Sequence, residues 1–346
     1  MTRSPALLPA RALLPARRRG AVGLVGIAAA AVVLAGCTAE PPTPTAEAPV
    51  VAAVVTASQE RRILDSVSTV LAEAEQAEDL GTRLSGPALA MREAELAVSA
   101  ARGDNEALTD LTMETQQLVL PSEQGWPRSS FAITTQPADG TVPVLAAFDQ
   151  ASARDQYKLW SYVRLVPNVT MPQFAEEGLG SAAVAPDDTS LLVTPEAVVE
   201  QYASVLTAGD ESRYADSFTD DDYLRQVLRQ SGQDQVAAIE SEDGEGTFEV
   251  TYEPTDDPVK AVRTVDGGAM VLVAMLSQET LRAEENWQLV PGAESSARAL
   301  WGDAEGTNVM QIAYRNTAAL YVPPADSAGR ISLLGVQRVP YAVSNG

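Results

Sequence analysis

The sequence predicts an α+β fold built from two tandem copies of a helix-then-strand unit. Apolar residues at helical spacing open each half of the chain, and runs rich in β-branched and aromatic residues follow them. A segment rich in Gly, Ala, Pro and Asp, residues 167–193, separates the two halves. We therefore expect a first domain at 56–166, a connector at 167–193 and a second domain at 194–346.

Residues 1–36 have the composition of an export signal. Arginines at 17–19 precede an apolar stretch that ends in small residues, which is the order of a signal peptide. The alternative is a membrane-spanning helix. The stretch at 20–36 is short of the ~20 residues that a spanning helix needs, and it consists mainly of Ala, Gly and Val. We expect a cleavable signal.

The single cysteine of the chain ends the run Leu34-Ala35-Gly36-Cys37. This run resembles the lipobox of bacterial lipoproteins. The resemblance implies cleavage between Gly36 and Cys37, acylation of the Cys37 thiol, and attachment to the lipid bilayer at the outer, extracytoplasmic face of the cell membrane. Two or more acyl chains hold a protein stably without a spanning helix.

The next segment, residues 37–55, is rich in Pro, Thr and Ala and cannot build a core of its own. Proline-rich segments of this kind are semi-extended. We expect it to be a tether between the lipid anchor and the first domain.

In the first domain, apolar spacing predicts helices at 57–77 and 88–101. Strand-like runs follow at 130–135, 142–148 and 158–166.

In the second domain, Thr194 and Pro195 are typical of a helix start, with Thr as the cap and Pro in the first turn. Gly209 ends this helix, and helical spacing resumes near Tyr223. The predicted strands that follow are 247–253, 259–265, 269–276, 309–314, 319–322 and 330–339.

Two segments of the first half recur in the second half in the same order. Residues 63–71 match 198–206 in their apolar, acidic and small positions, and residues 131–139 match 248–256. Two matches in one order predict a tandem duplication.

The second half also resembles a known superfamily at its opening. Residues 203–221 contain a helix end, a Gly-Asp turn and the pattern Ala-x-x-Phe-x-Asp-Asp. This opening is similar to that of nuclear-transport-factor-like, or ketosteroid-isomerase-like, proteins. The resemblance implies a cone-shaped, cystatin-like domain: helices packed into a strongly bent antiparallel sheet, with a pocket at the open end. The whole chain resembles uncharacterised actinobacterial lipoproteins with tandem domains of this type.

The composition excludes several functions. The chain has no histidine, so the commonest general base and the commonest transition-metal ligand are both absent. Its formal net charge of −23 at pH 7 disfavours nucleic acid as a partner. With a single cysteine, no disulfide can form within the chain.

Catalysis in the resembled superfamily needs a base in an apolar pocket and donors for a developing oxyanion. The weak candidates for such a pocket are Tyr202, Tyr214, Phe218 and Asp216. The alternative is that the tyrosines are core residues and that the acidic run at 220–222 is a solvated helix start. An inward-facing carboxylate among Asp216, Asp220 and Asp221 would favour an enzyme.

We expect no catalytic residues, no cofactor and no metal site, because the acidic clusters lack the spacing of a calcium loop. The expected role is non-catalytic binding of a small ligand, a wall component or an envelope protein. The alternatives are an isomerase or hydratase of ketosteroid-isomerase type and a structural accessory subunit of an envelope complex.

Overall fold

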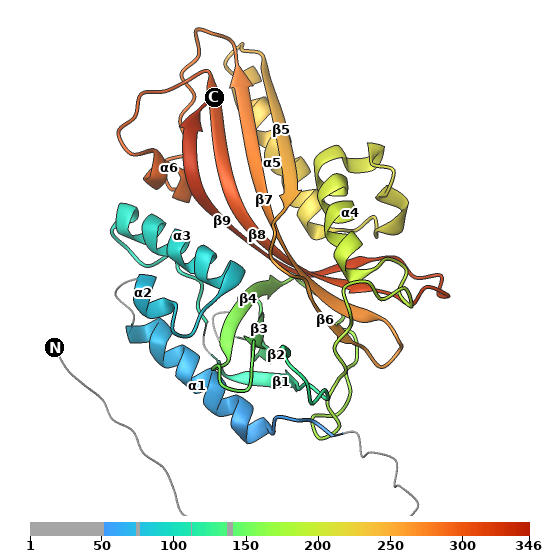
Figure 1. The fold of residues 1–346 in the computed structure, drawn as a ribbon. Helices are drawn as coiled ribbons and strands as arrows, with labels where there is room; N and C mark the ends of the chain where they lie inside the picture. The colour runs from blue at the N-terminus through green and yellow to red at the C-terminus, as the bar shows by residue number, and fades with distance from the viewer. Residues whose placement is uncertain (1–51, 74–76, 112, 137–140) are drawn as a thin grey trace, which may run out of the picture. The chain divides into compact units, whose positions relative to one another are not determined.

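The structure, a computed structural model, describes residues 52–73, 77–111, 113–136 and 141–346 (Figure 1). These residues lie in one compact unit, Pro49–Gly346. The expected signal peptide, the lipobox and Cys37 lie outside the described residues. Across the described part of the chain, no helix is both long and apolar enough to cross a membrane.

The first half consists of three helices followed by four strands. Helices α1 and α3 correspond to the two predicted helices, and the first strand, β1, was not predicted. The bounds are α1 Ala57–Glu73, α2 Ala77–Leu80, α3 Gly86–Arg102, β1 Thr115–Val119, β2 Arg128–Thr134, β3 Val144–Gln150 and β4 Lys158–Leu165.

The second half repeats the order of helices before strands. Its bounds are α4 Pro195–Ala208, α5 Tyr223–Glu240, β5 Gly246–Pro254, β6 Lys260–Arg263, β7 Ala269–Ala283, α6 Ser296–Trp301, β8 Val309–Val322 and β9 Ser332–Asn345. The predicted ends of α4 are confirmed: the Thr194 side chain accepts a hydrogen bond from the Ala197 N–H, and Gly209 follows the helix with a φ of +59°. Such a positive φ favours glycine.

All described strands belong to one antiparallel sheet with the order β1-β2-β3-β4-β9-β8-β7-β5, and β6 pairs with β7. The two halves join where β4 meets β9, with Arg164 opposite Val336 and Leu165 opposite Gly335. A Cβ atom at Gly335 would lie 2.7 Å from Val163 Cγ2 and 2.9 Å from Arg164 O, so this close junction requires glycine.

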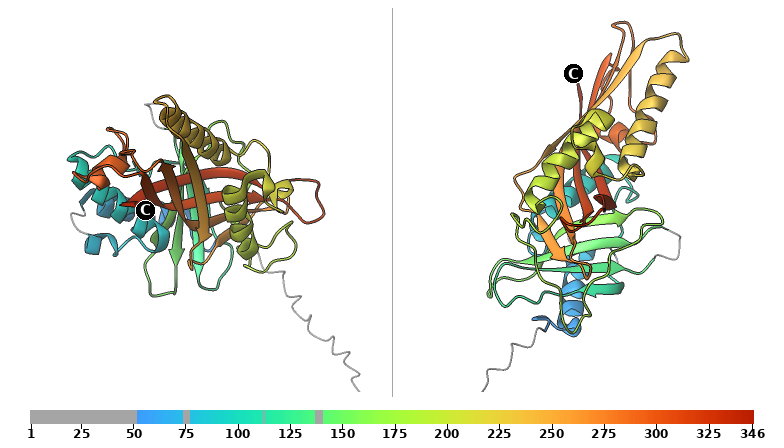
Figure 2. Two further views of the ribbon diagram at one scale, coloured as in Figure 1. Left: turned by 90° about the horizontal axis from the view of Figure 1, so that it is seen from above. Right: turned by 90° about the vertical axis from the view of Figure 1, so that its right-hand side faces the viewer.

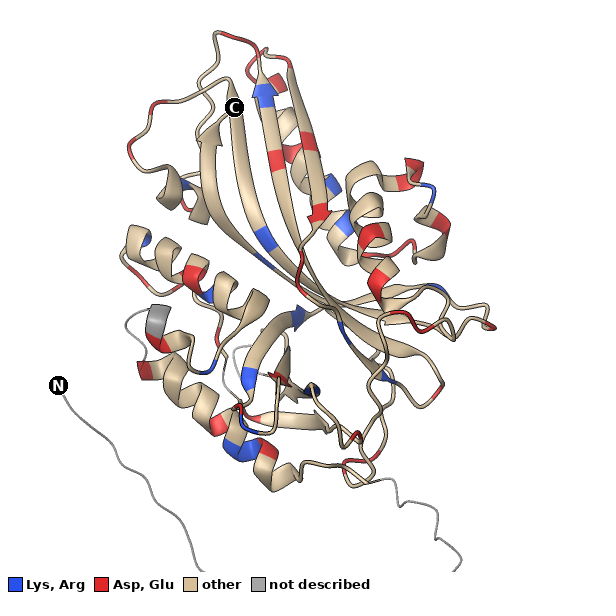
Figure 3. Cartoon of the chain, viewed as in Figure 1, with Lys and Arg blue, Asp and Glu red and all other residues tan. Residues whose placement is uncertain are grey.

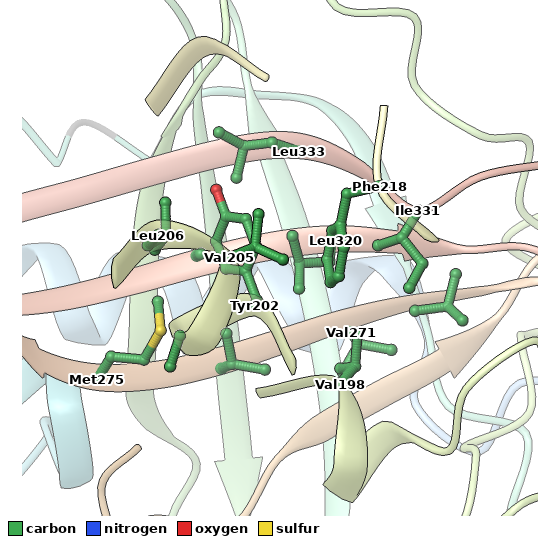
Figure 4. Packing of buried hydrophobic residues seen from close by; sticks show 14 of the residues in the cluster. Val198, Tyr202, Val205, Leu206, Phe218, Val271, Met275, Leu320, Ile331 and Leu333 are labelled. Atoms are coloured by element: carbon green, nitrogen blue, oxygen red, sulfur yellow. The ribbon is translucent and has the colours of Figure 1, made fainter. Parts of the chain in front are cut away.

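Three of the apolar clusters show how the halves pack. In the first cluster, α1 and α3 cover one face of β2 and β3. In the second, α4 covers one face of β7, β8 and β9; Figure 4 shows Tyr202 and Leu206 of α4 in the same packed cluster as Val271 and Leu320. The third cluster lies between the halves and joins Phe131 and Leu145 to residues of β7 and β8. Figures 1 and 2 show the helices distributed around this continuous sheet.

The expected division into two tandem cone-shaped domains is not confirmed. The sheet is continuous across the boundary, and Met270 and Leu272 of the second half share a buried cluster with Phe131 of the first. The predicted connector is also packed, because Ser181 N–H donates to Leu120 O (2.7 Å) and Val184 N–H donates to Ala261 O (3.0 Å). The boundaries at 56–166, 167–193 and 194–346 stay predictions.

The end of the predicted tether belongs to the folded unit as well. Ala53 N–H donates to Gly178 O (3.1 Å), Val54 N–H donates to Pro121 O (2.9 Å), and the Val55 side chain is buried. These backbone bonds are made with loops far along the chain, which is why the local composition did not reveal them.

The two sequence matches have different outcomes. The first falls on α1 and α4, which open the two halves, and its equivalent positions Val67 and Tyr202 are both buried. The second aligns β2, which is second in the sheet, with β5, which is at the sheet edge. Phe131 and Phe248 therefore do not occupy equivalent positions.

Shortening Leu272 to alanine tests whether the halves unfold together. Leu272 is fully buried between them, so Leu272→Ala is expected to lower the free energy of unfolding by about 2–5 kcal/mol. Urea unfolding followed by tryptophan fluorescence and by far-UV circular dichroism should still show one coincident transition. Val265→Ala, at an exposed position, is the control and should change little. Two separate transitions, only one of them shifted, would establish two independent domains.

Candidate functional site

A groove of about 850 Å³ lies between the end of α4, helix α5 and strand β5. Its lining is mainly apolar, and its charged residues are two arginines from α5, Glu240 and Glu249. The apolar contributors are Val205, Leu206, Leu228, Val236, Phe248 and Val250. We call it the α5–β5 groove.

Helix α5 is held beside this groove by its N-terminus. Asp222 caps the helix, with its Oδ1 accepting from Arg225 N–H at 2.9 Å. The Tyr202 hydroxyl of α4 donates to Asp222 Oδ2 at 3.0 Å. Burial raises the pKa of Asp222, and the bonds from Arg225 N–H and Tyr202 oppose that shift. One carboxyl thus connects α4 to the start of α5.

Further along α5, Gly232 allows the helix to approach the sheet edge. A Cβ atom at this position would lie 2.6 Å from Cδ1 of Phe248, whose ring lines the groove. The position therefore fixes how closely α5 approaches β5.

A second groove of about 610 Å³ lies on the other side of α5, toward α6 and strands β7 and β8. Its polar lining includes Glu279 and Tyr314 of the strands and Asp234 of α5, and Val227, Met310 and Ile312 contribute apolar surface. Helix α5 therefore has a groove along each side.

Glu279 belongs to a buried polar belt across β7, β8 and β9. Its Oε1 accepts from Arg338 Nη2 at 2.8 Å, and its Oε2 accepts from the Tyr314 hydroxyl at 3.2 Å. Arg338 also donates to Asn316 Oδ1 (3.1 Å), and Asn316 Nδ2 donates to Ser277 Oγ (3.0 Å). Both oxygens of the carboxylate are thus engaged within the protein.

The environment of the belt favours the neutral form of the Tyr314 hydroxyl and the charged form of Arg338. Burial, followed by the nearby Glu279 charge, raises the pKa of the Tyr314 hydroxyl. The pKa of Arg338 is raised despite burial, because Tyr252, Glu279 and Tyr314 favour its charged form. The belt therefore combines a permanent cation with neutral phenols.

The four predicted pocket residues lie elsewhere, and none of them lines either groove. Tyr202 and Phe218 are buried in the core, where their rings stack at 5.4 Å with an interplanar angle of 27° (Figure 4). Tyr214 is half-buried beneath the Arg213 guanidinium, 4.6 Å from the ring centroid. Asp216 is exposed in a short 3-10 turn.

The acidic run at 220–222 was predicted to be a solvated cluster, and one of its three residues does not fit that prediction. Asp222 is buried, because its carboxyl is the cap described above. Asp216, Asp220 and Asp221 are exposed, so none of these three faces inward. The described residues contain no group of three or more acidic, His or Cys side chains placed to hold a metal ion.

No sequence pattern indicated the buried carboxyl of Glu60 on α1. The side chain is fully buried, and Ser130 Oγ donates to its Oε1 at 2.6 Å. Within the described residues its Oε2 has no hydrogen-bond partner. Burial raises the pKa of Glu60 to about 7, against the lowering effect of the Ser130 bond.

Replacing Glu60 by glutamine is expected to reduce the pH dependence of stability. The folded pKa of about 7 lies above the ordinary 4.5, so the stabilisation is complete below pH 4.5 and is lost as the pH rises through 7. The loss is on the order of 3 kcal/mol in the wild type and should be absent in Glu60→Gln, which keeps an acceptor for Ser130. Urea unfolding at pH 5 and pH 8 measures it. The control is Asp65→Asn, an exposed change on the same helix. Equal pH dependence in wild type and Glu60→Gln would contradict this expectation.

Comparisons with known proteins agree with a lipoprotein and name no activity. A protein of Streptomyces avermitilis described as an "Uncharacterized lipoprotein" is 26% identical over 229 residues, which cover 65% of this chain and 64% of the relative. The match thus spans less than two thirds of that relative's length. No solved structure matches. Residues 51–340 match the family described as "Domain of unknown function (DUF8094)", and the chain belongs to this family.

Proposed function

We propose that this protein is a lipid-anchored envelope lipoprotein whose α5–β5 groove binds a small amphipathic or apolar ligand without catalysis. The observation that carries the proposal is the groove itself, about 850 Å³ with a mainly apolar lining that also includes two arginines and two glutamates. Ligand pockets of proteins commonly have volumes of ~300–1,000 Å³ and this kind of lining.

The location rests on two independent observations. The run that ends at Cys37 resembles a lipobox, and the Streptomyces avermitilis relative carries the name of a lipoprotein. Acylation of Cys37 would anchor the chain at the outer face of the cell membrane.

The proposal that the protein is not a catalyst rests on the hydrogen bonding and exposure of the acidic residues that line the two grooves. Glu279 accepts hydrogen bonds from both Arg338 and Tyr314, so neither oxygen is left as a free base. Glu240 and Glu249 in the α5–β5 groove, and Asp234 in the smaller groove, are exposed to solvent and lack the apolar burial typical of a catalytic base. The chain has no histidine to replace them.

One observation favours a second candidate, an isomerase or hydratase of ketosteroid-isomerase type. Glu279 and Tyr314 both line the smaller groove, where a carboxylate and a phenol could act as base and donor. In this candidate, a ligand would have to displace Arg338 from Glu279 before proton transfer.

The tandem architecture belongs to the proposal as well. Each half has helices followed by antiparallel strands, and the last strands of the two halves, β4 and β9, pair with each other. This order supports two cone-type units that have fused along their last strands into one sheet.

The anchor is tested by replacing the acylated residue. Cys37→Ala is expected to abolish incorporation of radioactive fatty acid, since no other cysteine is present. The protein should also leave the membrane fraction or accumulate as an uncleaved precursor. Persistent labelling of the variant would refute the lipoprotein assignment.

The groove is tested by native mass spectrometry of the protein released from its own membranes in a mild detergent. The wild type is expected to carry a bound small molecule, whereas Ala237→Trp should lose it, because this exposed residue of α5 lines the groove. The control Gln226→Trp changes an exposed position of α5 outside that lining and should keep the ligand. A ligand-free mass together with a co-purifying protein would contradict the groove and favour an accessory subunit.

A further inference from the structure

A third cavity, of about 420 Å³, lies in the first half, away from the grooves beside α5. Its charged lining residues are three arginines, Arg62, Arg83 and Arg128, and no acidic residue lines it. We call it the arginine pocket. Its charge contrasts with that of the whole chain, which has 47 acidic and 24 basic residues (Figure 3).

Three different segments supply these arginines. Arg62 is on α1, together with the lining residues Gln59 and Ser66 at helical spacing. Arg83 follows α2, and Arg128 begins β2, directly opposite Gln150 of β3. The pocket is thus a product of the fold and could not be recognised as a basic motif in the sequence.

Arg128 is held in place before any ligand arrives. Its Nε donates to Gly125 O at 2.9 Å, and its Nη2 donates to Gln124 O at 2.6 Å. The guanidinium also stacks over Trp126, 4.0 Å from the ring centroid. A guanidinium fixed in this way loses little further entropy when it binds an anion.

The wall of the pocket contains a polar group that lacks a partner. Tyr157 lines the pocket, its side chain is 7% exposed, and its hydroxyl has no hydrogen-bond partner among the described residues. Burial, followed by the charge of Glu60, raises its pKa to about 12, so the hydroxyl keeps its proton and remains a donor.

We propose that the arginine pocket binds a phosphate group. Three guanidiniums offer the planar, forked donors that match phosphate oxygens, and no lining carboxylate competes for them. The phosphate can belong to free phosphate or to the head group of an anionic lipid. A lipid head group agrees with the position of the predicted lipid anchor in the sequence. Val54 and Val55 line the pocket and lie at the end of the predicted tether that begins at Cys37.

The first experiment titrates inorganic phosphate into the full chain in a neutral detergent and follows tryptophan fluorescence. Trp126 reports on Arg128, because the guanidinium lies over its ring. The chain has four tryptophans, so the variant Trp126→Phe is used to measure how much of the fluorescence change comes from Trp126. The double variant Arg62→Gln/Arg83→Gln is expected to bind phosphate at least about tenfold more weakly. Replacing both arginines by lysine keeps the charge and loses the forked donors, so its affinity should be intermediate.

Arg61→Gln is the matched control, because Arg61 precedes Arg62 on α1, is exposed and does not line the pocket. It removes one positive charge and should leave phosphate affinity within about twofold of wild type. Equal loss in Arg61→Gln, unchanged affinity in the double variant, or no saturable phosphate binding by the wild type would each overturn the proposal.

A second arm distinguishes the two sources. The protein is reconstituted into vesicles of phosphatidylcholine alone and into vesicles that also contain phosphatidylglycerol. A Trp126 response confined to the second vesicles, and lost in the double variant, identifies a lipid head group. Saturable phosphate binding with no difference between the vesicles identifies free phosphate.

Discussion

The structure depends on the junction between β4 and β9, where the last strands of the two halves pair. Gly335 permits this approach, and the buried cluster of Phe131, Met270 and Leu272 fills the space between the halves. Polar bonds reinforce it: Glu95 of α3 accepts from Thr109 at 2.6 Å, and Gln337 of β9 donates to Thr109 at 2.8 Å. Since buried polar groups are costly unless they are paired, these bonds require both halves to be in place together.

Helix α5 of the second half packs a smaller share of its residues into the core than α4 does. Its buried side chains are few and include Leu224, Leu228 and Ile239, whereas α4 is buried along most of one face. The Asp222 cap and the approach at Gly232 fix the helix at its start and middle, and a groove remains on each side. The proposed binding surface thus lies beside a helix with few buried side chains, as is common for functional regions.

Local signals predicted the fold more successfully than the site. The cap at Thr194 and the stop at Gly209 act within one helix, so the sequence revealed them directly. Strand β8 was divided into two because Asn316 and Thr317 interrupt its apolar pattern, although both are buried and hydrogen-bonded. The arginine pocket and the Glu279 belt escaped prediction because each gathers residues from several separate segments. Tyr202 and Phe218 had the composition of a pocket wall but stack on each other in the core.

The charge distribution links the two proposed surfaces. A net charge of −23 makes the approach of an anion unfavourable everywhere except where cations are concentrated and unopposed. The lining of the arginine pocket meets that condition, whereas Arg225 beside the α5–β5 groove is paired with Asp210 at 2.5 Å. The two proposals therefore assign different chemistry to the two surfaces: an apolar lining beside α5 and a cluster of arginines beside α1. Because one sheet and one shared core join the halves, both surfaces belong to a single folded unit.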